Sequence, residues 1–163
     1  MKRLLIVWHG RTGATAQMVQ AAREGASTED EVLTIVLPAA QASSADVLAA
    51  DALLFAAPEN LASLSGEMKE FFDRSYYDLL DRCNGKAYGS IICAGSDGEG
   101  AQRQLDRIAT GLRLRRVAPP IIINTSAQTR EAILAAKQLG ADDLNRGREL
   151  GALLGAGLAM GIF

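Results

Sequence analysis

Residues 4–15 read LLIVWHGRTGAT, and this stretch predicts both a fold and a binding site. Its first five residues form a continuous apolar run, which is typical of a strand buried on both faces of a parallel sheet. The turn that follows leads directly into an amphipathic helix. Backbone N–H groups and the helix dipole favour an anion at such a helix start. We therefore expect a phosphate-bearing ligand at the end of the first strand.

The residues of this turn suit an anion. Thr12 and Thr15 supply hydroxyl donors, while Gly10 and Gly13 let the main chain approach a ligand closely. The two glycines do not have the G-x-G-x-x-G spacing of a dinucleotide fingerprint. A P-loop would end in Gly-Lys-Ser/Thr, and this turn contains no lysine. Both of these phosphate-binding motifs are therefore disfavoured.

Two phosphoryl-transfer classes are also disfavoured. His9 is the only histidine of the chain, and Trp8 stands where the histidine phosphatases carry an arginine before their nucleophile. A receiver domain would need an aspartate at the end of its third strand, where this chain has Ala56-Ala57-Pro58. The turn is therefore interpreted as a binding loop.

Apolar runs and helical patterns alternate along the chain, which favours a parallel sheet covered by helices on both faces. We expect strands near residues 3–8, 32–37, 52–57, 87–94 and 120–124. Helical spacing predicts five helices. The first runs through Thr15–Ala22, the second lies near 43–50, and the third follows Ser65, which would cap its start. The fourth begins near Ala101 and Gly111 helps to end it, and the last begins at about Asp142.

Two segments fit this alternation less well. Residues 130–139 have helical propensity where the fold needs only a short link, so 126–140 is interpreted as a surface helix or lid of unknown role. Arg113-Leu114-Arg115-Arg116 is interpreted as a solvated loop rather than a patch that binds phosphate.

Composition narrows the class of protein. The 163 residues suit one domain, 1–163, and a net charge of −2 indicates neither a nucleic-acid partner nor an acidic docking surface. Cys83 and Cys93 lack metal spacing and are expected to be reduced thiols. The first apolar run is too short for a signal peptide, and the tail from Leu150 is too short to span a membrane. We expect a cytoplasmic protein.

Three segments resemble loops of the flavodoxin-like FMN-binding family, which includes an NAD(P)H-dependent FMN and quinone reductase branch. Residues 11–15 are similar to the phosphate loop [ST]-x-T-G-x-T, with Gly10 in place of the first Ser or Thr. Residues 57–61 and 65–74 resemble the signature P-x-x-x…S-G-x-[LM]-K-x-F-[FL]-D-R. Residues 93–100 resemble the small polar loop after the fourth strand.

The resemblance implies a flavodoxin-like, doubly wound α/β domain with a five-stranded parallel sheet of order 2-1-3-4-5 and one FMN. The ligand crevice of such a sheet opens between strands one and three, outside their carboxyl ends. The family's loops imply cofactor contacts, mostly through the main chain, while the side chains of Glu59, Asp97 and Glu99 are expected to face water. The implied cofactor-binding residues are Gly10, Arg11, Thr12, Gly13, Ala14, Thr15, Pro58, Glu59, Asn60, Leu61, Gly95, Ser96, Asp97 and Gly100, and none is assigned as catalytic.

The resemblance also implies an activity. Electron-carrying flavodoxins cover the flavin with aromatic rings, but residues 58–62 and 95–100 contain no aromatic residue. An uncovered face leaves room for a nicotinamide or quinone to stack, and the net charge of −2 lacks the acidic field of a carrier. We expect an NAD(P)H-dependent oxidoreductase of the quinone or flavin reductase type. The alternatives are a one-electron carrier and an interaction module without cofactor, to which the Gly10 departure points.

Subunit association stays open at this point. Tyr76 and Tyr77 are placed after the third helix and could pack near the flavin ring or pair with a second subunit. Gly147, Gly151 and Gly155 would let the last helix pack closely, which we expect to happen on its own sheet rather than on another subunit. A homodimer is an alternative because the family often completes an uncovered ring with a neighbouring chain.

Overall fold

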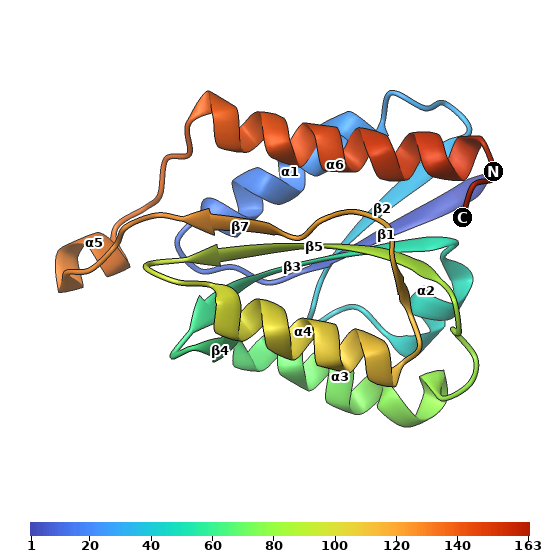
Figure 1. Cartoon of the computed structure of the whole chain (residues 1–163), viewed down its shortest axis with the longest axis horizontal. Coiled ribbons are helices and arrows are strands. Elements are labelled where there is room, and N and C mark those ends of the chain that lie inside the picture. The colour runs from blue at the N-terminus through green and yellow to red at the C-terminus, as the bar shows by residue number, and fades with distance from the viewer.

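A computed structural model describes all residues from Met1 to Phe163. Its centre is a parallel sheet in which the strands follow the order β2-β1-β3-β5, with β6 and β7 both paired to β5 (Figure 1). The expected order 2-1-3-4-5 is confirmed, because the fourth and fifth expected strands are β5 and β7. The parallel strands are β1 (Lys2–Trp8), β2 (Val32–Pro38), β3 (Ala52–Asn60), β5 (Ala87–Ala94), β6 (Arg115–Arg116) and β7 (Ile121–Asn124).

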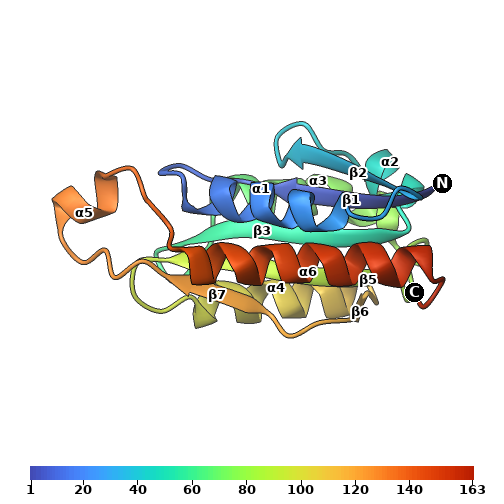
Figure 2. The ribbon, with the colours of Figure 1, turned by 90° about the horizontal axis from the view of Figure 1, so that it is seen from above.

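Helices cover both faces of the sheet (Figures 1 and 2). One face carries α1 (Ala14–Ala26) and α6 (Ala141–Ala159), and the other carries α2 (Ser44–Ala49), α3 (Gly66–Leu79) and α4 (Glu99–Gly111). The first strand shows why its apolar run is continuous. Leu4 and Ile6 belong to the core under α1 and α6, whereas Leu5 and Val7 belong to the core under α3 and α4. Every residue of this run therefore loses water on one face or the other.

The glycines of the last helix pack on α1, whereas its leucines, Leu150, Leu154 and Leu158, pack on the sheet. A Cβ on Gly151 would overlap the carbonyl of Ala22, and a Cβ on Gly25 would overlap the carbonyl of Arg148. The backbones of α1 and α6 are therefore in direct contact. The glycines of the last helix were expected to pack on the sheet, and this prediction was wrong because they pack on α1. The contact is within the chain, as expected, but it is made with another helix.

Helix α4 ends at Gly111, as expected, and a left-handed residue follows at Arg113, with φ 57°. Other local predictions need correction. Arg115 and Arg116 pair with β5, and Arg116 forms an ion pair with Asp106, so this stretch is not a free loop. One short strand was not expected: β4 (Ser63–Leu64), which pairs antiparallel with β3. The helix α5 (Arg130–Leu134) lies within the segment 126–140 that was interpreted as a surface helix or lid.

The two neighbouring tyrosines lie inside α3 rather than after it. The helix starts beside the carboxyl end of β3 and runs back along the sheet (Figure 1). Tyr76 and Tyr77, in its last turns, therefore lie toward the amino ends of the parallel strands, away from the carboxyl ends. Their side chains are exposed and pack on each other. No helix of the structure is both long and apolar enough to cross a membrane.

Candidate functional site

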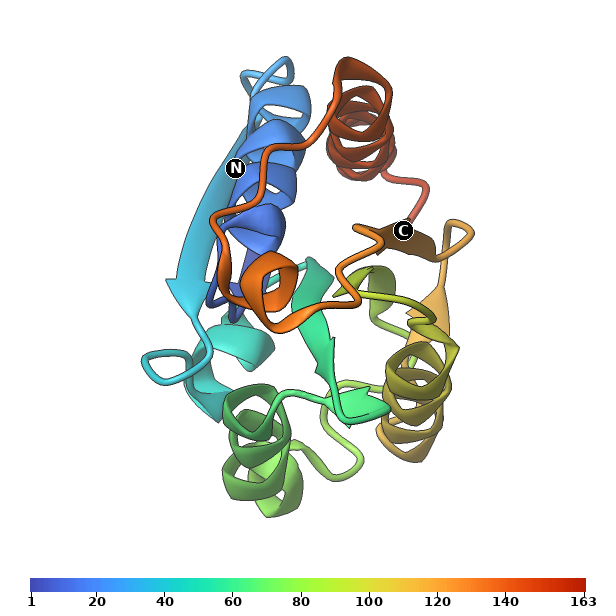
Figure 3. The same cartoon turned by 90° about the vertical axis from the view of Figure 1, so that its left-hand side faces the viewer.

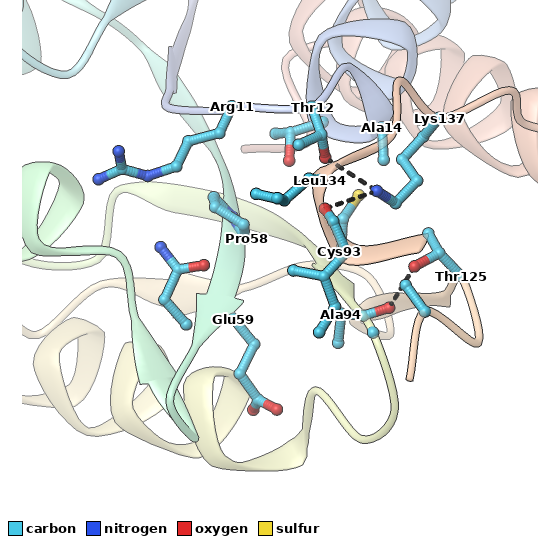
Figure 4. Close-up of a pocket in the computed structure, with 15 residues that line it drawn as sticks. Arg11, Thr12, Ala14, Pro58, Glu59, Cys93, Ala94, Thr125, Leu134 and Lys137 are labelled. Carbon is cyan, nitrogen blue, oxygen red and sulfur yellow. Dashed lines mark hydrogen bonds between the residues drawn. The ribbon is translucent and has the colours of Figure 1, made fainter. Parts of the chain in front are cut away.

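A pocket lies at the carboxyl ends of the strands, where β1 and β3 are neighbours and the connections leave on opposite faces of the sheet. This is the position at which open α/β sheets bind ligands. Figure 3 views this end, with α5 in front of the strand ends between α1 and α4. The cavity measures about 200 Å³ and is lined by Arg11, Thr12, Ala14, Thr15, Pro58, Glu59, Asn60, Cys93, Ala94, Gly95, Thr125, Ala127, Ile133, Leu134 and Lys137 (Figure 4).

The turn after β1 presents the start of α1 to this pocket. Gly13 is the N-cap residue and has φ 101°, a left-handed conformation that disfavours any residue with a Cβ. No side chain caps this helix, and its first turn contains no acidic residue. The N–H groups of the first turn are therefore available to an anion, whose charge the helix dipole also favours.

Gly10, which departs from the family's phosphate loop, lies in a tightly packed place. A Cβ at this position would lie 3.2 Å from Cβ of Thr15 and 3.3 Å from the Trp8 ring. Both distances are shorter than ordinary van der Waals contact, so Thr15 or the Trp8 ring would have to shift by a few tenths of an ångström to admit a serine or threonine. The packing around Gly10 is tight, and the remaining hydroxyls of the loop, those of Thr12 and Thr15, still belong to the pocket wall.

Glu59 does not face water, contrary to the expectation for its side chain. One carboxylate oxygen accepts the N–H of Gly98 at 2.9 Å, and the other accepts the N–H of Ala101 at 2.9 Å. The residue therefore caps α4 and ties the loop after β3 to the loop after β5. Asp97 and Glu99 are exposed, as expected.

The tip of the loop after β3 is held in an unusual backbone conformation. Leu61 and Ala62 have φ values of 51° and 62°, in the left-handed region that costs an L-residue about 1–2 kcal/mol. Pairing of Asn60 with Ser63, and of Glu59 with Leu64, holds the tip. The carboxamide of Gln104 on α4 supports the same hairpin by accepting the N–H of Leu64 at 2.7 Å.

A second polar cluster fastens the phosphate loop to α3. Ser65 was expected to cap this helix, but its hydroxyl makes no capping bond and is instead hydrogen-bonded to Nδ1 of His9 at 2.8 Å. Arg11 donates to Glu67 at 2.7 Å, which directs its guanidinium away from Lys137 (Figure 4). Burial lowers the pKa of His9 from its ordinary value; Glu67 opposes this shift, and Arg11 adds to it.

Cys93 and Thr15 form the floor of the pocket beside α1. Burial raises the pKa of the Cys93 thiol to about 11, although a hydrogen bond with Thr15 acts in the other direction. Cys83 is buried elsewhere, and both cysteines are free. The thiol of Cys93 is therefore neutral near pH 7 and gives the floor an apolar sulfur rather than a nucleophile.

The segment that sequence reasoning left without a role forms one wall of the pocket. Ala127, Ile133, Leu134 and Lys137 all line the cavity, and α5 lies over it (Figure 3). The sequence indicated a helix in this segment, since residues 130–139 have helical propensity where the fold needs only a short link. Nothing in the local sequence indicated that this helix would lie against the turn after β1.

The structure brings together eight of the expected binding residues in one cavity. The wall contains Arg11, Thr12, Ala14, Thr15, Pro58, Glu59, Asn60 and Gly95. Gly10 and Gly13 shape the turn behind this wall, while the other four expected residues do not line the cavity. Of these four, Leu61 follows β3, Ser96 and Asp97 lie between β5 and α4, and Gly100 lies in the first turn of α4.

Comparison with known proteins agrees with this geometry. A family model described as NADPH-dependent FMN reductase matches residues 10–128. A flavodoxin of Aquifex aeolicus (strain VF5) is 34% identical over 100 residues, 61% of this chain and 52% of that protein, so the match spans about half the length of this relative.

Solved structures share the fold at low sequence identity. A flavodoxin from the domain Archaea superposes with a TM-score of 0.76 at 16% identity, over 96% of this chain and 98% of that one. A WrbA-like flavodoxin from Agrobacterium tumefaciens gives 0.71 at 22% identity, over 99% of each chain.

The sheet order, the crevice between β1 and β3 and the three loops around it define a flavodoxin-like FMN-binding protein. Because the family model covers well over half of the sequence, the chain belongs to the NADPH-dependent FMN reductase family. FMN is the cofactor of this family. The residues present fit its phosphate, since the uncapped start of α1, the hydroxyl of Thr12 and the ammonium of Lys137 meet at one end of the pocket.

Proposed function

We propose that this chain binds one FMN and acts as an NADPH-dependent oxidoreductase of the quinone or flavin reductase type. The phosphate would lie against Thr12–Thr15, and the ring would extend from the loop 58–61 to the loop 95–100. The cavity of about 200 Å³ is smaller than the ~300–1,000 Å³ of common ligand clefts. Leu61, Ser96, Asp97 and Gly100, which do not line the cavity, are therefore proposed to contact the part of the cofactor outside it.

One observation carries the choice of an enzyme: none of the 15 residues that line the pocket is aromatic. Ile133 and Leu134 are the large apolar side chains of the wall, and both are more than half exposed, at 52% and 62%. A planar ring held here would keep a face accessible to a second planar molecule. Stacking of a nicotinamide or quinone on that face would position it for transfer without further groups.

The protein's own part in this chemistry is to bind, orient and shield. When bound, the flavin supplies hydride and electron transfer. The neutral thiol of Cys93 and the methyl group of Ala94 would give the inner wall an apolar surface, and Glu59 holds the two ring-side loops together through α4. No side chain of the pocket is assigned as a general acid or base, because hydride transfer between stacked rings requires none.

The test is anaerobic reduction of the FMN-loaded protein by NADPH. The loss of the absorbance of oxidised flavin measures this reduction. We expect rapid reduction by NADPH or NADH and reoxidation by an added quinone. Flavin that stays oxidised with both nucleotides would contradict the enzyme assignment. A colourless protein that takes up no added FMN would instead favour the interaction module.

A one-electron carrier is the second candidate, and the flavodoxin of Aquifex aeolicus at 34% identity favours it. Potentiometric titration of the FMN-loaded protein separates the two. A carrier should be reduced in two well-separated one-electron steps, whereas the reductase should take up both electrons together.

Association into a homodimer, proposed as a further property of the reductase, is measured independently by analytical ultracentrifugation.

A further inference from the structure

Lys137 lies at the phosphate end of the pocket, although it is far from the phosphate loop in sequence. Its ammonium is 3.3 Å from the hydroxyl oxygen of Thr12 (Figure 4). It also donates to the carbonyls of Ala132, Ile133 and Ala135 at 2.8, 3.0 and 2.7 Å. The side chain therefore spans the space between the turn after β1 and the end of α5.

The backbone of Lys137 is fixed to the same turn independently of its side chain. Its N–H donates to the carbonyl of Thr12 at 2.7 Å. The Gln17 carboxamide donates to the carbonyls of Gly13 and Lys137 and accepts the N–H of Leu139. These bonds place residues 137–139 alongside the start of α1. Because the backbone of Lys137 is fixed there, its ammonium group can reach only positions close to the start of α1.

The ammonium has no negative partner in this place. All four of its acceptors are uncharged oxygens, and the side chain is only partly exposed. The positive end of the α1 dipole points into the same space. A partly buried cation beside a helix N-terminus is electrostatically unfavourable until an anion lies between them.

We propose that Lys137 is a ligand of the terminal phosphate of FMN, supplied to the phosphate loop by the segment 126–140. The inference rests on the proposed cofactor. It also accounts for the missing hydroxyl at Gly10, since a cation from outside the loop contributes a stronger, charge-assisted bond. A purely structural role, in which Lys137 only caps the carbonyls at the end of α5, is the competing explanation.

Riboflavin separates the two roles because it has the same ring and ribityl chain as FMN but no phosphate. Dissociation constants of both flavins are measured by fluorescence quenching for the wild type, Lys137→Met, Lys137→Arg and a control, Lys69→Met. Lys69 pairs with Asp73 on the surface of α3, so the control removes the same charge away from the pocket.

We expect Lys137→Met to weaken FMN binding about 10-fold to 100-fold, the equivalent of one charge-assisted hydrogen bond, and to leave riboflavin binding unchanged. Lys137→Arg should recover part of the loss, since it keeps the charge but not the shape. The control should bind both flavins as the wild type does. Equal weakening of FMN and riboflavin, or no weakening of either, would overturn the assignment.

A measurement on the wild type covers the case in which the variants fail to fold. Acetylation of Lys137 by an amine-reactive ester is followed by mass spectrometry with no flavin, with FMN and with riboflavin. Protection by FMN alone supports phosphate contact, and equal protection by both flavins contradicts it. If the wild type binds neither flavin, the proposed function itself fails, which is a different result.

Discussion

Glu59 shows how one side chain can join two parts of a binding site. Its carboxylate accepts two N–H groups at the start of α4, a helix that no other side chain caps. We expect Glu59→Ala to lower the free energy of unfolding by about 1–2 kcal/mol, the usual value of a lost cap. Urea unfolding of the FMN-free protein measures this change. Glu31→Ala, an exposed carboxylate outside the site, serves as control and should change it by less than about 0.5 kcal/mol.

His9 gives the stability of the protein a pH dependence at the residue scale. Burial holds the pKa of His9 below the ordinary 6.5, so the unfolded chain binds a proton more readily than the folded one. This contribution to stability is complete above pH 6.5 and is lost as the pH falls through the pKa of the folded state. His9→Gln should therefore lose less stability than the wild type between about pH 7.5 and about pH 5.5 in urea unfolding. Identical losses in the two proteins would show that His9 is not the group responsible.

The contact between α1 and α6 is the feature that matters most at the scale of elements. Glycines at 25 and 151 remove the Cβ atoms that would otherwise separate the two backbones. The start of α1 is the proposed phosphate site, so the helix that α6 supports is also the helix that binds the cofactor. An error in this packing should therefore affect stability and binding together.

Gly151→Ala tests this packing. The new methyl group would overlap the carbonyl of Ala22, so the helices must separate, and we expect a loss of about 3 kcal/mol or more in the free energy of unfolding. Gly111→Ala is the matched control, because a Cβ there meets no atom within 4 Å. It should be neutral or stabilise α4 by up to about 1 kcal/mol, as expected from helix propensity. A Gly151→Ala protein as stable as the control would contradict the close contact.

At the scale of the whole molecule, the pocket couples cofactor binding to folding. Its walls come from the carboxyl ends of β3 and β5, from the turns after β1, β5 and β7, and from α5 and the residues after it, and these segments are brought together only in the folded state. FMN should therefore stabilise the folded protein by about 2.7 kcal/mol at a free concentration 100 times its dissociation constant. Unfolding with increasing FMN measures this, and a midpoint that does not move would mean that the flavin does not bind the folded state selectively.

The sequence determined the parts of this protein whose signals are local. Alternating apolar runs and helical patterns were sufficient for a parallel sheet covered by helices on both faces, and the family resemblance supplied the sheet order. Residues 10–15, 58–60 and 95 could be placed at one site because the carboxyl ends of parallel strands meet. Side-chain contacts were predicted less well. Ser65 was expected as a cap because it precedes a helix, but His9, which is 56 positions away, is its partner.

Only the tertiary structure decided where the remaining wall of the pocket comes from. The side chain of Gln17 holds residues 137–139 against the phosphate loop, across more than 100 residues of sequence. Neither the sequence around Gln17 nor residues 137–139 contain a motif that predicts this contact, because a side-chain amide can form a hydrogen bond with any backbone group that the fold brings near. The strands and the binding turn thus follow from local patterns, whereas Lys137 and α5 belong to the site only because the folded chain returns there.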